Sequence, residues 1–329
     1  MSITKIRALH QEVFQISNDH EFNDLALRIF YVHLILNPVY KQFIQFLDPV
    51  LPEHYTEIPC LPISAFKYHK VMLEDMEVEK TFMSSGTTGQ TRSKHHLADI
   101  SIYEQSFMQG FERVYGPVSD LCILALLPNY IEQGDSSLVY MVHELIDRSG
   151  HPQSEFILDD HAKLRKTLQD LHAKGQRTLL IGTTYALLDL VEGHPLSFPD
   201  LIVMETGGMK GRRKELIREE VHLRLQAGFG VKYIHSEYGM TELCSQAYAR
   251  RDGRFESPSW MKVLVRNTTD PRERMGDGRT GGVDILDLAN IYSCPFIASD
   301  DLGRLHRDES FEILGRFDHS DIRGCSLLI

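Results

Sequence analysis

Apolar residues with helical spacing dominate the first fifty residues of the chain. Between about residues 3 and 47 they recur every three or four positions, which predicts helices, and Asn37-Pro38 predicts a break between two of them. The stretch 58–67 contains two prolines, so it is predicted to be an extended connection rather than a helix. Residues 1–50 are therefore expected to form a helical N-terminal section.

From residue 121 onward, short apolar runs alternate with segments of helical period. The predicted strands are 121–127, 178–181, 201–204 and 231–235, and the predicted helices are 137–147, 160–173, 185–191 and 214–226. This alternation predicts crossover connections and a parallel sheet with helices on its faces. After residue 263 the pattern becomes β-rich, with a hairpin predicted around 307–310. The expected fold class is α/β.

Composition and charge narrow the classes of function. The chain has 329 residues, of which 42% are hydrophobic and 25% charged, so it is expected to be globular with a large core. Its formal net charge of -11 argues against a general nucleic-acid-binding or anionic-membrane surface. Any phosphate-bearing ligand must then be held by local cations.

The cysteines and the termini indicate a cellular compartment. There are five cysteines and no Cys-x-x-Cys motif, which favours a reducing environment over a disulfide scaffold or zinc site. They are Cys60, Cys122, Cys244, Cys294 and Cys325. Charged residues interrupt the first apolar run, and no later run reaches about 18 apolar residues. We therefore expect a cytoplasmic protein without a transmembrane segment.

The segment 81–94 has the composition of a phosphate-binding loop. Glycines let backbone N–H groups approach an anion, hydroxyl side chains donate further hydrogen bonds, and Arg92 and Lys94 add positive charge. The residues of its centre are Ser84, Ser85, Gly86, Thr87, Thr88 and Gly89. Only two residues separate the glycines, so this is not a Walker P-loop. An ordinary polar surface loop is the alternative interpretation.

Three polar segments are expected at strand ends, where open α/β sheets bind ligands. They are 205–211, 236–243 and 299–305. The first contains adjacent glycines, Gly207 and Gly208, which would let a flat ring lie against the backbone. The second combines the aromatic Tyr238, the hydroxyl of Thr241 and the carboxylate of Glu242 within five residues.

Five short motifs of this chain, four of them within the segments just described, occur in the order found in adenylate-forming enzymes. Ser84–Gly89, Gly207-Gly208, Tyr238–Glu242, Asp301-Leu-Gly303 and Gly315-Arg-Phe-Asp318 resemble the core motifs of that superfamily. Further segments extend the similarity, so that nearly the whole chain resembles the acyl-protein synthetase (long-chain fatty acid:protein ligase) family. They are 37–40, 58–62, 205–214 and 321–325. Known members feed the fatty-acid reductase of bacterial bioluminescence.

The resemblance implies a fold and a division of the chain. It implies the large N-terminal domain of an adenylate-forming enzyme, with parallel sheets flanked by helices and a β-rich C-terminal portion. Residues 1–329 would be one acyl-protein synthetase domain, with a nucleotide- and acyl-binding core at 80–315 and a tail at 316–329. Most members continue into a mobile lid that carries a catalytic lysine, whereas this sequence stops at Ile329. The expectation is that the lid is missing and that adenylation is slow in isolation or completed by a partner.

It also implies ATP and Mg²⁺ as cofactors and assigns roles to residues. Ser84–Gly89 and Lys94 would hold the β- and γ-phosphates, and Gly207, Gly208 and Tyr238 would enclose adenine. Thr241 would hydrogen-bond the α-phosphate, and Glu242 would bind Mg²⁺. Asp301, assisted by Arg316, would accept the ribose hydroxyls. Two alternatives stay open, because Tyr238 could be a core residue and Asp301 a turn residue.

The reaction implied has two steps. A carboxylic acid of medium or long chain would attack the α-phosphorus to give an acyl-adenylate, and Cys325 would then accept the acyl group as a thioester for a partner enzyme. The partner would be an acyl reductase, a synthase or an acyl carrier protein. Two alternatives remain: an external thiol such as CoA or an acyl carrier protein, with Cys325 inert, and a non-catalytic nucleotide-binding subunit of a complex.

Overall fold

Three N-terminal helices follow the predicted pattern. The computed structural model describes residues 3–47, 50–85, 91–127, 135–158, 160–207 and 217–317. Helices α1 (Ile3–Val13), α2 (Asp19–Leu36) and α3 (Pro38–Leu47) account for the first section. The side chain of Asn37 accepts a hydrogen bond from the backbone N–H of Tyr40, and Pro38 occupies the first turn of α3, where its missing N–H is tolerated. The predicted break at Asn37-Pro38 is confirmed.

A six-stranded sheet forms one half of the molecule. Its strands are β4 (Cys122–Leu126), β5 (Glu155–Ile157), β6 (Thr178–Thr183), β7 (Ile202–Thr206), β8 (His235–Tyr238) and β9 (Ala247–Ala249). The spatial order is β5-β4-β6-β7-β8-β9, and only β9 runs antiparallel to its neighbour. The interior strands β4 and β6 are buried along their whole length, which explains their continuous apolar runs. The predicted parallel sheet is confirmed.

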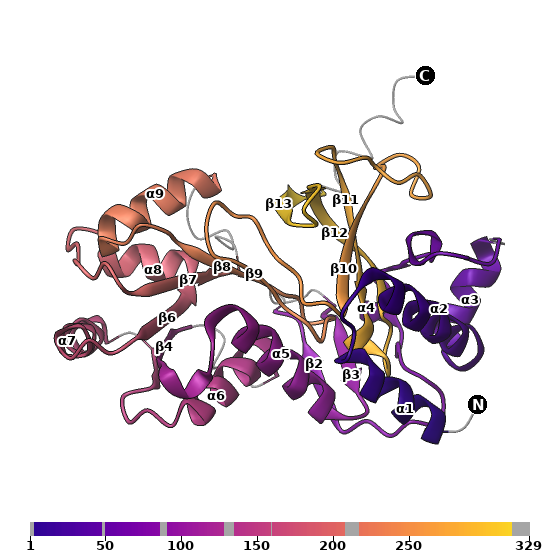
Figure 1. Cartoon of the computed structure of the whole chain (residues 1–329), viewed down its shortest axis with the longest axis horizontal. Helices are drawn as coiled ribbons and strands as arrows, with labels where there is room; N and C mark the ends of the chain where they lie inside the picture. Colours follow the sequence, from indigo (N-terminus) through magenta and orange to yellow (C-terminus); the bar gives the residue numbers. More distant parts are fainter. Residues whose placement is uncertain are drawn as a thin grey trace.

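Helices cover both faces of this sheet. They are α5 (Ile100–Tyr115), α6 (Ser137–Ser149), α7 (His161–Ala173), α8 (Thr184–Val191) and α9 (Arg218–Phe229). In Figure 1, α5 and α6 lie below the sheet and α8 and α9 lie above it. Helices on both faces of the sheet are typical of strands that are joined in parallel through helical connections.

Two strand predictions were wrong in position. Strand β8 begins at His235, not at Val231, because α9 continues to Phe229 and Gly230 ends it in a left-handed conformation. The segment 299–305 is not a loop but the second half of β12 (Phe296–Leu305), paired with neighbours on both sides. From residue 298 to residue 304, buried positions alternate with half-buried ones, which is the period of a strand.

A five-stranded sheet forms the other half. It contains β1 (Leu61–Pro62), β10 (Met261–Arg266), β11 (Thr280–Asp287), β12 and β13 (Phe311–Arg316), in the order β1-β12-β11-β10 with β13 also paired to β12. The predicted hairpin is confirmed, since β12 and β13 are antiparallel and His306 donates its N–H to Ser310. The connection 58–67 is extended at β1 but ends in the short helix α4 (Ala65–Tyr68), which the prediction missed.

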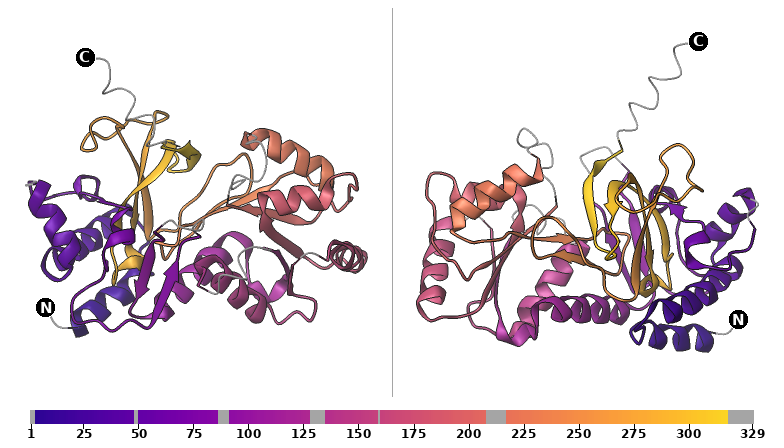
Figure 2. Two further views of the ribbon diagram at one scale, coloured as in Figure 1. Left: turned by 180° about the vertical axis from the view of Figure 1, so that it is seen from behind. Right: turned by 45° about the horizontal axis from the view of Figure 1, so that its top comes forward.

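A small hairpin lies between the two halves. It consists of β2 (Lys80–Met83) and β3 (Lys94–Leu97). The views in Figure 2 show the six-stranded sheet on one side of this hairpin, and the five-stranded sheet with the N-terminal helices on the other. The predicted phosphate loop is therefore attached at the junction of the two halves.

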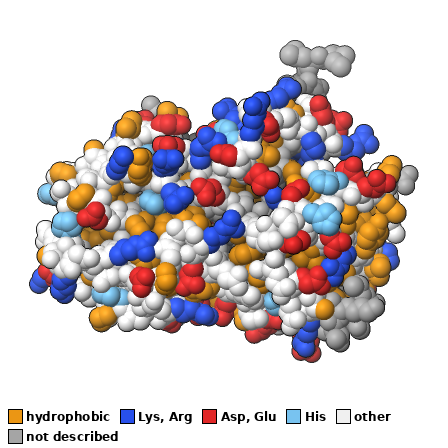
Figure 3. Space-filling view, viewed as in Figure 1, with side chains coloured by type: hydrophobic (Ala, Val, Ile, Leu, Met, Phe, Trp, Pro, Cys, Tyr) orange, Lys and Arg blue, Asp and Glu red, His pale blue; other side chains and the backbone are white. Residues whose placement is uncertain are grey.

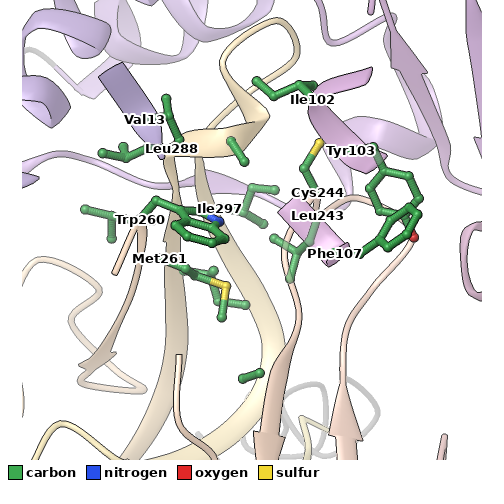
Figure 4. Close-up of a cluster of buried hydrophobic side chains, with 14 of the residues drawn as sticks. Val13, Ile102, Tyr103, Phe107, Leu243, Cys244, Trp260, Met261, Leu288 and Ile297 are labelled. Carbon is green, nitrogen blue, oxygen red and sulfur yellow. The ribbon is translucent and has the colours of Figure 1, made fainter. Parts of the chain in front are cut away.

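Buried side chains from distant parts of the sequence hold this junction together. Figure 4 shows Tyr103 and Phe107 of α5 beside Leu243 and Cys244, and it shows Trp260, which directly precedes β10, in the same buried cluster. The indole N–H of Trp260 lies 2.9 Å from Ser245 Oγ and 3.1 Å from Ser106 Oγ, so its polar atom is satisfied inside the core. The segment after Tyr238 is thus packed against both halves.

The surface is mixed in character. Figure 3 shows charged side chains of both signs spread over one face, while hydrophobic side chains gather at the right-hand edge. Exposed apolar residues of the N-terminal helices and the segment after them include Ile35, Phe46 and Leu51. None of the helices in the described ranges combines the length and apolar character that a membrane span requires. The proposed division at residues 50, 80 and 316 stays a prediction.

Candidate active site

Three of the predicted site residues meet where β8 ends. The Tyr238 hydroxyl donates a hydrogen bond to Asp301 Oδ2 at 2.7 Å, and Arg316 Nε donates to Asp301 Oδ1 at 3.0 Å. Asp301 is buried, whereas the Arg316 side chain is 74% exposed. Burial raises the pKa of Tyr238, so its hydroxyl stays protonated and can donate. Motifs more than sixty residues apart in sequence thus form one hydrogen-bonded group.

Two phenylalanines pack against the Tyr238 ring. It contacts Phe311 with centroids 5.5 Å apart and Phe255 with centroids 5.7 Å apart, yet the residue is only half-buried. Such edge-on aromatic contacts fix the orientation of a ring. A fixed and partly exposed ring is what stacking on a base requires, and contact with adenine stays a prediction.

The Asp301-Leu-Gly303 motif needs a glycine at its third position because β13 lies very close to it. A Cβ added at Gly303 would lie 2.6 Å from the backbone oxygen of Glu312 in the neighbouring strand β13. Any larger residue would separate β12 from β13 and break the register that places Asp301 opposite Arg316. The glycine of the Asp301-Leu-Gly303 motif therefore keeps the two site residues together.

The base of the phosphate loop is closed by hydrogen bonds between its two strands. Ser84 N donates to Ser93 O at 3.1 Å, and Ser93 N donates to Ser84 Oγ at 2.9 Å. Arg92 donates to the backbone oxygen of Ser84, so this cation is tied to the hairpin, while Lys94 is exposed. Ser85 is the last described residue after β2, and the predicted residues Gly86, Thr87, Thr88 and Gly89 lie outside the described residues.

A buried histidine connects this hairpin to the Tyr238–Glu242 motif. His95 of β3 is fully buried; its Nδ1 lies 2.8 Å from Thr241 O and its Nε2 lies 2.9 Å from Asn290 Oδ1. Burial lowers the pKa of His95 to about 4, so near pH 7 the ring is neutral and carries one N–H. His95 therefore acts as an internal brace behind Thr241 and is too deeply buried to touch a substrate.

Glu242 lies beside the base of the phosphate loop. Interaction with the Ser93 side chain favours the charged form of its carboxyl group, and its backbone oxygen accepts a hydrogen bond from Asn290 Nδ2 at 2.8 Å. The residue is 5% exposed, and burial raises the pKa of its carboxyl group. A buried carboxylate next to a phosphate loop has the hard oxygen donors that Mg²⁺ prefers, so its chemistry fits the predicted metal ligand.

The turn after β7 lies next to the end of β8. Gly207 has φ of 63°, a conformation that favours glycine, and its carbonyl is 3.1 Å from Thr184 Oγ1. Thr206 is the register partner of Glu237 and donates to its carboxylate at 2.5 Å. Gly207 is thereby placed beside Tyr238, while Gly208 lies outside the described residues.

Glu237 predicts an unusual dependence of stability on pH. Burial raises the pKa of Glu237 from 4.5 to about 7, so its stabilising contribution is complete below pH 4.5 and is lost as the pH rises through 7. Glutamine does not titrate, so the free energy of unfolding of Glu237→Gln, taken relative to that of the wild type, should rise when the pH is raised from 4.5 to 8. The expected rise is on the order of 2–3 kcal/mol. Urea unfolding at both pH values measures this difference.

The exposed Glu53 supplies the control for this prediction. Glu53→Gln removes a carboxylate that loses little hydration on folding, so its effect should be the same at both pH values. A Glu237→Gln effect that does not change with pH would contradict the assigned burial of this carboxylate.

Sequence analysis missed several residues of the site. Asn290 stands alone in the apolar run 288–291, and such an isolated polar residue is a signal for a buried hydrogen-bonding role. Glu237 and Thr206 were within segments already singled out, but nothing in their spacing showed that they would pair across β7 and β8. The structural role of His95 likewise becomes visible only through its burial in the folded protein.

Known proteins share this fold. An ATP-bound MatB from Rhodopseudomonas palustris matches with a TM-score of 0.53 and 18% identity, over 73% of this chain and 48% of that one. A 2-hydroxyisobutyryl-CoA ligase in complex with 2-HIB-AMP matches with a TM-score of 0.64 and 13% identity, over 91% of this chain and 68% of that one. The chain spans about half the length of MatB. These similarities confirm the predicted fold of adenylate-forming enzymes.

Sequence comparisons are more specific. A long-chain-fatty-acid–luciferin-component ligase from Vibrio harveyi is 24% identical over 333 aligned positions, which cover 90% of this chain and 83% of that protein. The model of the family described as "Acyl-protein synthetase, LuxE" matches residues 7–329. With almost its whole length matched, and with the motif residues of the adenylate-forming fold gathered around Tyr238 and Asp301, the chain belongs to the LuxE acyl-protein synthetase family.

Proposed function

We propose that this protein uses ATP to activate a fatty acid as the acyl-adenylate and then takes the acyl group onto Cys325 as a thioester. The observation that carries the first half is the convergence of Tyr238, Asp301 and Arg316 at the end of β8, next to the Gly207 turn. A ring, a buried carboxylate and a guanidinium suit the base and ribose of a nucleotide. The name of the Vibrio harveyi relative supports a long-chain acid as substrate.

In the first step, a carboxylate oxygen of the acid attacks the α-phosphorus of ATP and pyrophosphate leaves. Both reactants are anionic, so catalysis consists mainly of positioning and charge neutralisation. Thr241 would donate to the α-phosphate, and Lys94 and the phosphate loop would hold the leaving phosphates. When bound at Glu242, Mg²⁺ would neutralise phosphate charge. His95 braces Thr241 and so keeps its hydroxyl-bearing segment in place.

In the second step, the thiolate of Cys325 attacks the carbonyl carbon, the bond to AMP breaks, and the thiol proton passes to solvent. The other cysteines are poorly suited to this role. Burial raises the pKa of Cys294 to about 12 and that of Cys122 to about 11, and it also raises the pKa of Cys60 and Cys244. Cys325 lies outside the described residues, and its role rests on the family motif.

Two other functions remain as competing hypotheses. The acceptor could be an external thiol of CoA or an acyl carrier protein, with Cys325 uninvolved. The chain could instead be a non-catalytic nucleotide-binding subunit that organises a reductase or synthase complex. We favour self-acylation in the cytoplasm and delivery to an acyl reductase, because the Vibrio harveyi relative is named as a ligase of a luciferin component.

Intact mass spectrometry tests the proposal. The wild type is incubated with Mg-ATP and a panel of carboxylic acids, and we expect a hydroxylamine-labile adduct with the mass of an acyl group. Cys325→Ala should lose the adduct completely, whereas Cys60→Ala, which removes a half-buried thiol, should keep it. Acid-dependent release of pyrophosphate is measured in parallel.

The outcomes separate the hypotheses. Acid-dependent pyrophosphate release without an adduct would assign the acyl group to an external acceptor. No acid-dependent pyrophosphate release with any acid of the panel would favour the non-catalytic subunit.

A further inference from the structure

A small cavity of about 100 Å³ lies between α5 and β9, apart from the Tyr238–Asp301 group. Its lining includes Gly110, Arg113, Gln246, Tyr248, Arg250 and Glu256. Gly110 of α5 has no side chain, which leaves space for the cavity. Apart from its chain neighbours and the backbone of its own helix, no atom lies within 4 Å of the position that a Cβ would occupy there. The cavity exceeds the space needed by one water molecule.

Two buried polar groups of this lining have no hydrogen-bond partner within the described ranges. They are Gln246 Oε1 and Tyr248 Oη, in residues that are only 6% and 2% exposed. Leaving such a group unpaired costs about 1–3 kcal/mol, so unpaired groups of this kind point to a missing ligand. Gln246 directly precedes β9 and Tyr248 lies within it, and both residues line the cavity.

Packing holds the Tyr248 hydroxyl in position. The Tyr248 ring contacts Tyr115 with centroids 5.5 Å apart and Phe111 with centroids 6.0 Å apart, both from α5. Its hydroxyl can donate and accept a hydrogen bond, whereas Gln246 Oε1 can only accept. A ligand hydroxyl could accept from Tyr248 and donate to Gln246, which would satisfy both groups at once.

The mouth of the cavity carries an excess of positive charge. Arg113 on α5 is exposed and makes no ion pair with any described residue. Arg250 Nη2 lies 3.7 Å from Glu256 Oε1, and both side chains are more than half exposed, so this ion pair is weak. Two guanidinium groups facing one carboxylate favour an anionic ligand.

We propose that this cavity is a binding site for a small hydroxylated oxyanion. The ligand hydroxyl would lie between Gln246 and Tyr248, and its anionic oxygens would face Arg113 and Arg250. Hydrogen phosphate and a short hydroxycarboxylate share this chemistry, and separate titrations distinguish them. Because Tyr248 and Ala247 are the register partners of Glu237 and Tyr238, the site lies directly behind the strand that ends in the candidate active site.

Calorimetric titration of the full chain with glycolate, acetate and inorganic phosphate, at constant ionic strength and without ATP, tests the site. We expect saturable binding of glycolate or phosphate. Acetate, which lacks the hydroxyl, should bind at least about fivefold more weakly than glycolate. Tyr248→Phe should weaken binding of the preferred ion about tenfold, the loss expected for one hydrogen bond. Gly110→Leu should abolish binding by filling the cavity, with circular dichroism confirming the fold.

Matched variants separate this site from the phosphate loop. Arg113→Ala should weaken binding several-fold, while Arg272→Ala, which removes an 87% exposed arginine elsewhere, should leave it unchanged. Equal affinity in the wild type and a folded Gly110→Leu variant would overturn the proposal, since the ion would then bind at another place. Absence of saturable binding of both glycolate and phosphate to the wild type would also overturn it, as would saturable binding of glycolate that acetate matches in affinity.

Discussion

Asp301→Asn is expected to lower kcat/KM for ATP by about 100-fold, with the change mainly in KM. In the free protein Asp301 accepts hydrogen bonds from Tyr238 and Arg316, and in the proposed complex it accepts those of the ribose. A hydrogen bond to a charged group contributes about 1.5–3 kcal/mol, so weakening two of them corresponds to roughly 3 kcal/mol or 100-fold. Acid-dependent pyrophosphate release at varied ATP concentration measures the effect.

Asp300 provides a matched control, because it precedes Asp301 in β12 and successive side chains of a strand point to opposite faces. Asp300→Asn should change kcat/KM less than threefold. Thermal unfolding of both variants separates a loss of nucleotide contacts from a loss of folded protein. Unchanged KM for ATP in a folded Asp301→Asn variant would exclude the proposed ribose contact.

Glu242→Gln is expected to reduce kcat by about 100-fold or more without destabilising the fold. The amide keeps the shape of the side chain but removes the anionic oxygen proposed to hold Mg²⁺. Burial raises the pKa of Glu242, so the charged form is unfavourable in the folded protein and its removal should leave the unfolding temperature unchanged or higher. A lower kcat together with an unchanged or higher unfolding temperature would identify Glu242 as a functional rather than a structural residue.

The Mg²⁺ dependence completes this test. Because Glu242 must lose its proton to bind the cation, the apparent Mg²⁺ affinity of the wild type should fall as the pH decreases, and that of the variant should be weak at every pH. A variant with wild-type kcat and wild-type Mg²⁺ dependence would assign the metal to other ligands.

Local pattern was enough to predict the architecture. A strand with one face in solvent alternates apolar and polar residues, whereas the segments that form β4 and β6 are apolar almost without interruption. Continuous apolar runs are typical of strands that are buried on both faces, and they predicted a parallel sheet. Where the prediction failed, tertiary pairing overrode local signals. The segment 299–305 was expected to follow a strand, with a new strand predicted only from residue 303, yet pairing with β11 and β13 makes the whole segment part of β12, whose alternate positions hold Asp301 and Gly303.

The motif residues were predictable, but their partners were not. Sequence alone singled out Tyr238, Asp301 and Arg316, because aromatic, carboxylate and guanidinium groups recur in an order typical of nucleotide-activating enzymes. Their hydrogen bonds depend on the β12–β13 register, which Gly303 permits through its close approach to Glu312. Register of this kind depends on contacts across strands and cannot be read from spacing along one of them.

The family resemblance, the alternation of strands and helices, and the residue types that suit a phosphate loop, a base and a ribose were all predictable from the sequence. The folded chain was needed to show that His95 and Asn290 brace the Tyr238–Glu242 segment from within. It was also needed to show that Gln246 and Tyr248 border a cavity with polar atoms that lack partners among the described residues. The physical reason is that burial and hydrogen-bond satisfaction are properties of three-dimensional neighbours. A polar residue in the chain becomes a brace or a ligand only when folding removes water from around it.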